Sequence, residues 1–255
     1  MRVRILFLCI FAAAIAAAAD LPYAGKWKIN NDKSDFGETT VTYTMLPSGE
    51  WRAMQDGQSY KFKMDGSDYS DGLGDMAAWK SIDAKTWQTT WKVNGRTLTT
   101  DTLTVGTDGV LTVNTKGTKP NGEVTNDTTT LQRISGGPGL AGKWKTKNVK
   151  SASPEVMEFV ASDHNGLAYR VPAIGMTCDA KLDGKNYPCS GPTLPRGWTV
   201  AMTKSGVTTL TVSVQKDGKP FYRFAYSTSA DGKTLTATGG AAATNEKIRM
   251  VYDRQ

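Results

Sequence analysis

The pentapeptide AGKWK occurs at residues 24–28 and again at residues 141–145 of this 255-residue chain. The correspondence extends further, because FKMDGSDYSDG at residues 62–72 is similar to AKLDGKNYPCSG at residues 180–191. The matching segments keep the same order and similar spacing in both halves. The chain therefore consists of two copies of one unit of roughly 115 residues, a size at which a domain forms its own core.

Short runs in which apolar and polar residues alternate recur in both copies, for example TTVTYTM, TWQTTWKV, TLTVSV and FYRFAYST. Turn signals such as NG, TDG, KDG and ADG separate them. This pattern is typical of antiparallel strands joined by tight turns. Each copy offers about eight to ten strands, enough to close an up-and-down barrel. We predict an all-β fold with two tandem antiparallel up-and-down β-barrels.

The Gly/Pro-rich segment ISGGPGLAG separates the two copies. Such composition is typical of a linker between domains. The sequence thus predicts a first barrel over residues 20–134, a linker over residues 135–139 and a second barrel over residues 140–255. We expect the two halves to fold independently.

The first 19 residues have the layout of a secretory signal peptide. Arg2 and Arg4 precede an apolar run, and small residues lead to Ala19, with Ala17-x-Ala19 as the cleavage site. The alternative is a retained membrane anchor, but the run is shorter than the roughly 20 residues of a span. We expect export to the periplasm or beyond the cell, with no transmembrane segment in the mature chain.

Cys178 and Cys189 remain after cleavage, and an even pair in an oxidising compartment favours a disulfide. A two-residue type I′ turn at Asp183 and Gly184 would place the two cysteines opposite each other on a hairpin, in a hydrogen-bonded pair. Opposed strand residues lie within disulfide range. The alternative is a pair of buried free thiols.

Gly25-Lys26-Trp27 and Gly142-Lys143-Trp144 resemble the Gly-x-Trp that opens the first strand of lipocalins and related calycin barrels, avidins among them. The Asp-Gly-Lys-x-Tyr-Pro segment is also similar to uncharacterised exported bacterial lipocalin-like proteins. The resemblance implies a barrel whose base is plugged by the tryptophan and a basic residue of the last strand. By this resemblance Arg133 stacks on Trp27 in the first copy and Arg254 on Trp144 in the second, as cation–π pairs.

Alternation places aromatic side chains on one face of several strands, where they form either a packed core or the wall of a ligand cavity. Five of the seven tryptophans lie in the first copy, so we expect a ligand there rather than in the second. We predict a small apolar or amphipathic ligand; the alternative is a ligand-free structural or interaction module of the cell envelope. The candidate lining residues are Tyr60, Phe62, Tyr69, Trp87, Trp91, Tyr187, Tyr222 and Phe224.

Residues suited to catalysis are scarce. The only histidine is His164, so a serine or cysteine nucleophile has no second histidine to orient or activate it. Four aspartates lie within residues 65–75, but their spacing does not match a calcium-binding loop. We expect no enzymatic activity, no metal and no cofactor.

Charge is uneven between the copies. Residues 20–134 carry 13 basic and 15 acidic residues, whereas residues 135–255 carry 16 and 9. Lys143, Lys145 and Lys147 alternate along the first predicted strand of the second copy. This basic second domain could attract an anionic envelope surface; the alternative is an ordinary solvated surface. The basic residues are not interleaved with aromatic ones, so we expect no specific nucleic-acid binding.

Overall fold

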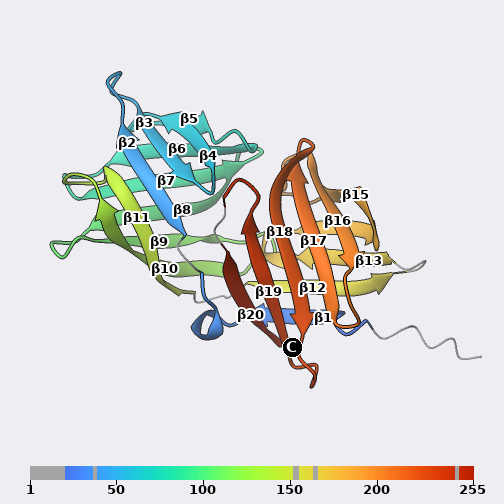
Figure 1. The fold of residues 1–255 in the computed structure, drawn as a ribbon. Helices are drawn as coiled ribbons and strands as arrows, with labels where there is room; N and C mark the ends of the chain where they lie inside the picture. The colour runs from blue at the N-terminus through green and yellow to red at the C-terminus, as the bar shows by residue number, and fades with distance from the viewer. Residues whose placement is uncertain (1–20, 37–38, 152–154, 163–165, 245–246) are drawn as a thin grey trace, which may run out of the picture.

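The computed structural model describes residues 21–255, apart from 37–38, 152–154, 163–165 and 245–246. The predicted signal peptide and His164 lie outside the described residues. Strands in two antiparallel ten-stranded sheets dominate the described chain, together with two short 3₁₀ turns, η1 (Asn31–Lys33) and η2 (Pro172–Ile174). The predicted all-β fold with two barrels is confirmed (Figure 1). Within the described residues, no helix has the length and apolar character needed to span a membrane.

One sheet closes on itself and is called the closed barrel; the other is nearly closed and is called the open barrel. The closed barrel contains, in spatial order, β1 (Gly25–Ile29), β12 (Val156–Ser162), β13 (Gly166–Val171), β14 (Met176–Lys181), β15 (Asp183–Ser190), β16 (Trp198–Lys204), β17 (Thr209–Lys216), β18 (Lys219–Thr228), β19 (Thr234–Ala241) and β20 (Ile248–Arg254). The open barrel contains β4 (Gln58–Phe62), β3 (Trp51–Gln55), β2 (Thr40–Met45), β11 (Gly142–Lys150), β10 (Val124–Ser135), β9 (Val110–Thr118), β8 (Arg96–Val105), β7 (Thr86–Val93), β6 (Asp75–Ser81) and β5 (Asp65–Ser70).

The two copies exchange their first strands. The strand β1 of the first copy lies between β12 and β20 of the second, with Trp27 opposite both Met157 and Arg254. Conversely, β11 of the second copy lies between β2 and β10 of the first. In Figure 1 the blue β1 accordingly lies beside the yellow and dark-red strands of the other barrel.

This exchange departs from the expected division of the chain into two contiguous barrels. The strands β10 and β11 are antiparallel neighbours in one sheet, with Arg133 opposite Trp144. The Gly/Pro-rich segment at residues 135–139 is therefore part of a hairpin connection, not a linker between barrels. The change of barrel falls elsewhere, because β1 of the closed barrel is followed by β2 of the open barrel, and β11 of the open barrel is followed by β12 of the closed barrel.

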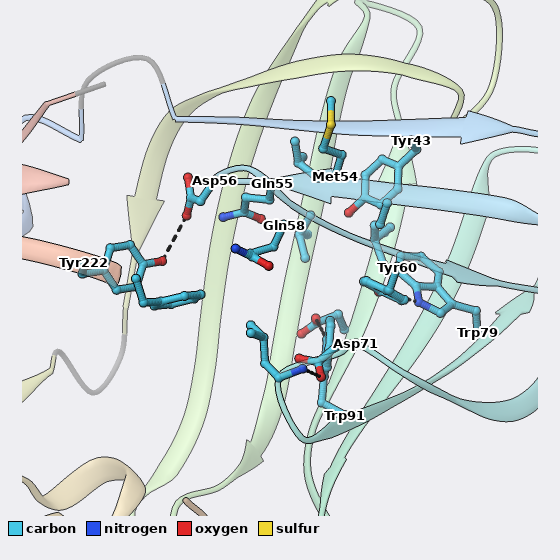
Figure 2. A pocket seen from close by; sticks show the side chains of 17 residues that line it. Tyr43, Met54, Gln55, Asp56, Gln58, Tyr60, Asp71, Trp79, Trp91 and Tyr222 are labelled. Carbon is cyan, nitrogen blue, oxygen red and sulfur yellow. Dashed lines mark hydrogen bonds between the residues drawn. The ribbon is translucent and has the colours of Figure 1, made fainter. Parts of the chain in front are cut away.

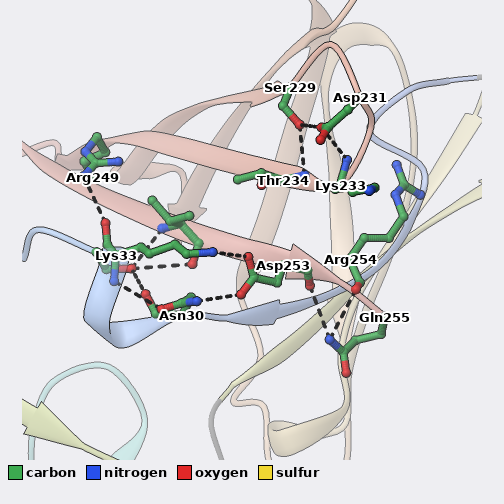
Figure 3. A network of polar contacts seen from close by, with 12 residues as sticks. Asn30, Lys33, Ser229, Asp231, Lys233, Thr234, Arg249, Asp253, Arg254 and Gln255 are labelled. Carbon is green, nitrogen blue, oxygen red and sulfur yellow. Dashed lines mark hydrogen bonds and ion pairs between the residues drawn. The ribbon is translucent and has the colours of Figure 1, made fainter.

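The exchange is possible because β1 and β11 both begin with the same Gly-Lys-Trp-Lys sequence, so either strand suits either position. The segment that follows β1 is also anchored to β20 (Figure 3). Asn30 Nδ2 donates a hydrogen bond to Asp253 at 2.6 Å, and Lys33 Nζ lies 3.1 Å from the same carboxylate. The guanidinium of Arg249 donates to the carbonyl oxygen of Lys33 at 2.9 Å. The hydrogen bonds from Asn30 and Lys33 hold the pKa of Asp253 below its usual value.

Each exchanged tryptophan stacks on an arginine of the barrel that receives it. The Arg254 guanidinium carbon lies 4.1 Å from the Trp27 ring centroid, and that of Arg133 lies 4.0 Å from the Trp144 ring. The expectation that Trp27 stacks on Arg133 is therefore wrong, because strand exchange gives each tryptophan the arginine of the other copy. Both indoles are fully buried in their barrel cores.

Cys178 and Cys189 form the predicted disulfide, and they are directly opposed on β14 and β15. The predicted turn is wrong, however. Only Gly184 has a positive φ, of 75°, whereas a type I′ turn requires positive φ at both central residues. The Cα–Cα distance of 4.3 Å also indicates a non-hydrogen-bonded pair, not the hydrogen-bonded pair that the turn implied.

The disulfide joins β14 and β15, and the seam between these two strands closes the closed barrel. The corresponding seam remains open in the open barrel. Within the described residues, β14 and β15 pair only at Cys178–Cys189 and at the next position along each strand. The equivalent strands β4 and β5 form the two edges of the open barrel. Where the closed barrel has its cysteines, the open barrel has Tyr60 and Asp71. This seam borders the cavity described next.

Candidate ligand cavities

A cavity of about 240 Å³ lies in the open barrel and reaches the closed barrel (Figure 2). We call it the open-barrel cavity. Most of its walls come from β2, β3, β4, β6, β7 and β8, while Phe221 and Tyr222 are supplied by β18 of the closed barrel. The aromatic residues that line it are Tyr43, Tyr60, Trp79, Trp91, Phe221 and Tyr222.

The aromatic walls are held by contacts between rings and by indole hydrogen bonds. The Trp79 indole donates to the Tyr60 hydroxyl at 3.0 Å, and Trp79 also stacks on Phe62 with a centroid distance of 4.5 Å. Tyr60 meets Trp91 edge to face at 6.1 Å. Burial raises the pKa of both Tyr43 and Tyr60, so their hydroxyls stay protonated at neutral pH. The walls are thus rigid, apolar surfaces with hydroxyl groups at fixed positions.

Asp101 provides a carboxylate inside this aromatic cavity. The Trp91 indole donates to Asp101 Oδ2 at 2.9 Å. Oδ1 is buried and lacks a hydrogen bond of good geometry among the described residues, although Thr115 lies opposite Asp101 on β9. Burial raises the pKa of Asp101, and the side chains of Thr115 and Trp91 partly oppose this shift. A buried acceptor without a partner is uncommon in folded proteins and costs about 1–3 kcal/mol. A ligand that donates a hydrogen bond to Oδ1 would remove that cost.

A second cavity, of about 400 Å³, lies in the closed barrel and is called the closed-barrel cavity. It is lined by Tyr169, Tyr226, Tyr252 and Phe224, and by Glu155 from the crossover segment before β12. The two cavities share Asp56 and Tyr222, whose side chains are joined by a hydrogen bond of 3.1 Å (Figure 2). Both cavities therefore border the contact between the barrels.

The β3–β4 hairpin brings Asp56 to this contact. Asp56 and Gly57 have φ values of 51° and 76°, as a type I′ turn requires. A Cβ atom on Gly57 would lie 2.5 Å from the Cβ of Ala243 in the closed barrel. The closeness of this contact leaves room only for glycine at the hairpin tip.

The structure places the predicted lining residues in four different environments. Tyr60, Trp91 and Tyr222 line the open-barrel cavity, and Tyr222 and Phe224 line the closed-barrel cavity. Phe62 and Trp87 are buried in the core of the open barrel. The remaining two, Tyr69 and Tyr187, pack at the core edges and donate to Asp65 and Asp183, respectively. Asp56, Asp101 and Glu155 were not among the predicted residues.

The four aspartates of residues 65–75 do not converge. Asp65 accepts hydrogen bonds from Ser67 and Tyr69, and Asp68 pairs with Lys92 at 2.7 Å. Asp71 Oδ1 accepts from three backbone N–H groups of the following turn. Within the described part of the chain, no group of three or more metal-ligating side chains occurs.

Asp75 should make the stability of the protein depend on pH. Burial and the nearby charge of Asp71 raise the pKa of Asp75 to about 6. The folded state then holds its proton more tightly than the unfolded state, so stability falls as pH rises from about 4 to about 6. After allowance for solvent screening, we expect Asp75→Asn to raise the Tm by about 2–4 °C above pH 6, corresponding to about 1 kcal/mol, and by almost nothing near pH 4. Thermal melts across this range test the prediction, and a difference that does not vary with pH would contradict it.

Strand exchange also removes the charge asymmetry of the two copies. Residues 40–150, which form the open barrel, contain 14 basic and 11 acidic residues, and the rest of the chain from residue 20 onward contains 15 and 13. The basic strand with Lys143, Lys145 and Lys147 lies in the open barrel, because it is one of the exchanged strands. The folded units are therefore similar in charge, unlike the sequence repeats.

The chain matches no family model, and no curated protein or solved structure shows significant similarity to it. The fold and the cavities therefore carry the functional argument by themselves.

Proposed function

We propose that this protein is an exported binding protein that holds a small aromatic or amphipathic molecule in the open-barrel cavity. The observation that supports the proposal most strongly is the combination of aromatic walls with the unpaired Asp101 Oδ1. Ligand sites are typically apolar concavities with a few fixed polar groups that orient the ligand. The Asp101 carboxylate would accept a hydrogen bond from a hydroxyl or amine, while the rings contact the apolar part.

The size of the cavity restricts the ligand. About 240 Å³ is below the usual range of roughly 300–1,000 Å³ for ligand pockets. A molecule with one or two rings or a short chain suits this space, whereas a carotenoid or a porphyrin would extend well outside it. We therefore favour small phenols, small quinols and short-chain amphiphiles.

We also propose that the barrels are related to lipocalins. Two features support this relation: the Gly-x-Trp that opens β1 and β11, and the arginine stacked on each tryptophan. Each barrel has ten strands, more than the eight of an up-and-down lipocalin barrel. Export is proposed from the N-terminal sequence, and the disulfide is compatible with it.

Tryptophan fluorescence tests the binding proposal, because Trp79 and Trp91 line the cavity. The mature chain is titrated with small phenols, quinols and short-chain fatty acids, and protein from its own host is inspected by native mass spectrometry for a bound molecule. We expect Trp91→Ala and Asp101→Asn to weaken binding of a phenol at least tenfold. Gln88→Ala, on the opposite face of the same strand as Trp91, should leave the affinity unchanged.

Equal affinity in the Trp91, Asp101 and Gln88 variants would contradict the assignment to this cavity. No emission change with any probe, together with no bound molecule in protein from its host, would instead favour the ligand-free interaction module.

A further inference from the structure

The charged residues that line the two cavities are all acidic. They are Asp56, Asp71 and Asp101 in the open-barrel cavity, and Asp56 and Glu155 in the closed-barrel cavity. Among the described residues, no lysine or arginine lines either one, although the chain contains 31 Lys and Arg against 24 Asp and Glu. The charge of the cavity walls is thus negative, whereas the net charge of the whole chain is positive. Because fields inside a low-dielectric cavity are weakly screened, this difference affects which molecules enter.

One of these carboxylates, Glu155, lines the closed-barrel cavity together with several aromatic rings, although its side chain is also exposed to solvent. Glu155 lies directly before β12, where its backbone carbonyl accepts a hydrogen bond from Ile29 of the exchanged strand at 2.8 Å. Tyr169 and Tyr226 line the same cavity and both contact the Phe159 ring, with centroid distances of 5.1 and 5.3 Å. These contacts fix the rings that Glu155 faces across the cavity.

The charge of Glu155 also affects the pKa values of the tyrosines in this cavity. Burial raises the pKa of Tyr226 and Tyr252, and the negative charge of Glu155 raises both pKa values further. The three side chains therefore interact electrostatically across the same cavity, and the phenols remain neutral. Burial raises the pKa of Glu155 itself, and the charge of Lys119, which does not line the cavity, partly opposes this shift.

We propose that the closed-barrel cavity binds an organic cation, a quaternary or protonated amine with apolar substituents. The electron-rich faces of the tyrosine rings attract such a cation, and desolvated cation–π contacts contribute about 2 kcal/mol or more. Glu155 supplies the opposite charge. A metal ion is a poorer occupant, because the cavity offers Glu155 and Asp56 but no cluster of oxygen ligands. The volume of about 400 Å³ is sufficient for an aromatic ammonium compound.

The experiment compares two molecules of nearly equal shape, benzyltrimethylammonium and its neutral carbon isostere neopentylbenzene. Their binding to the full mature chain is measured by ligand-observed NMR and calorimetry. We expect the cation to bind at least tenfold more tightly than the isostere. Glu155→Gln should remove most of this preference, whereas Glu158→Gln should preserve it. Glu158 is a matched control, because it belongs to β12 but does not line the cavity.

A second pair of variants tests the aromatic contribution without changing charge. Tyr169→Phe keeps the ring and should retain cation binding, whereas Tyr169→Leu should weaken it several-fold. Thermal melts confirm that each variant is folded before binding is compared. Equal affinity for the cation and the isostere, or equal loss in the Glu155 and Glu158 variants, would overturn the proposal.

The proposal does not depend on the occupant of the open-barrel cavity. The same titrations show which of the two cavities binds the cation. Binding of benzyltrimethylammonium should survive Trp91→Ala, which alters only the open-barrel cavity. Loss of cation binding in Trp91→Ala, with binding retained in Glu155→Gln, would place the cation in the other cavity and refute the present assignment.

Discussion

Trp27→Ala should destabilise the closed barrel by about 3–5 kcal/mol, although Trp27 belongs to the first copy of the repeat and the closed barrel is otherwise built from the second. The side chain is fully buried, its indole donates to the carbonyl oxygen of Tyr23 at 2.9 Å, and the Arg254 guanidinium stacks on its face. Alanine removes these contacts and leaves a cavity that the rigid barrel wall cannot fill. A loss of this size is a large part of the stability of most domains.

Hydrogen exchange followed by mass spectrometry shows which barrel is affected. In Trp27→Ala, peptides from residues 156–255 should lose protection, while those from residues 40–135 should change little. The matched variant is Trp144→Ala, which has an equivalent indole hydrogen bond to Leu140 and an equivalent stack on Arg133. It should give the opposite pattern. If each tryptophan instead destabilised the barrel of its own copy, the strand exchange would be wrong.

The sequence was sufficient to predict the fold class, because alternation and turn residues are local signals. At two of the turn signals, Asn94 with Gly95 and Asp217 with Gly218 have positive φ at both positions, as in a type I′ hairpin. The strand exchange could not be predicted in the same way. Since β1 and β11 share the sequence Gly-Lys-Trp-Lys, their local pattern is the same in the exchanged and unexchanged arrangements. What distinguishes the arrangements is tertiary, namely the contacts of residues 30–35 with β20.

The candidate sites were predictable only in part, for a related reason. Asp101 precedes the buried Leu103 by two positions in β8, so alternation alone could have indicated that this carboxylate faces inward. Nothing local indicates the role of Asp56 or Glu155. Asp56 lies in a hairpin turn, where aspartate is common for conformational reasons, and Glu155 lies between β11 and β12, outside any strand. Asp56 reaches the closed-barrel cavity only because the two barrels are in contact.

After cleavage of the chain between the two copies, the two fragments should stay associated under native conditions. A protease site inserted between Gly137 and Pro138 lies in the exposed β10–β11 connection, and an added side chain at Gly137 meets no neighbouring atom within 4 Å. After cleavage, each fragment still contributes one central strand to the barrel of the other. Separation would require β1 to leave two neighbouring strands and β11 to leave two others. We therefore expect the fragments to elute as one species on size-exclusion chromatography and to separate only in denaturant.

Two contiguous barrels would behave differently, because each fragment would then be a complete domain. Only contacts between barrels, such as the Tyr222–Asp56 hydrogen bond, would join them, and such an interface dissociates on dilution. The measurement is therefore repeated down to nanomolar concentration. A second site between Asn121 and Gly122, in the connection of β9 and β10, provides the control, since its fragments share a sheet in either arrangement. Fragments that separate on dilution after cleavage at residue 137, but not after cleavage at residue 121, would show that the strands are not exchanged.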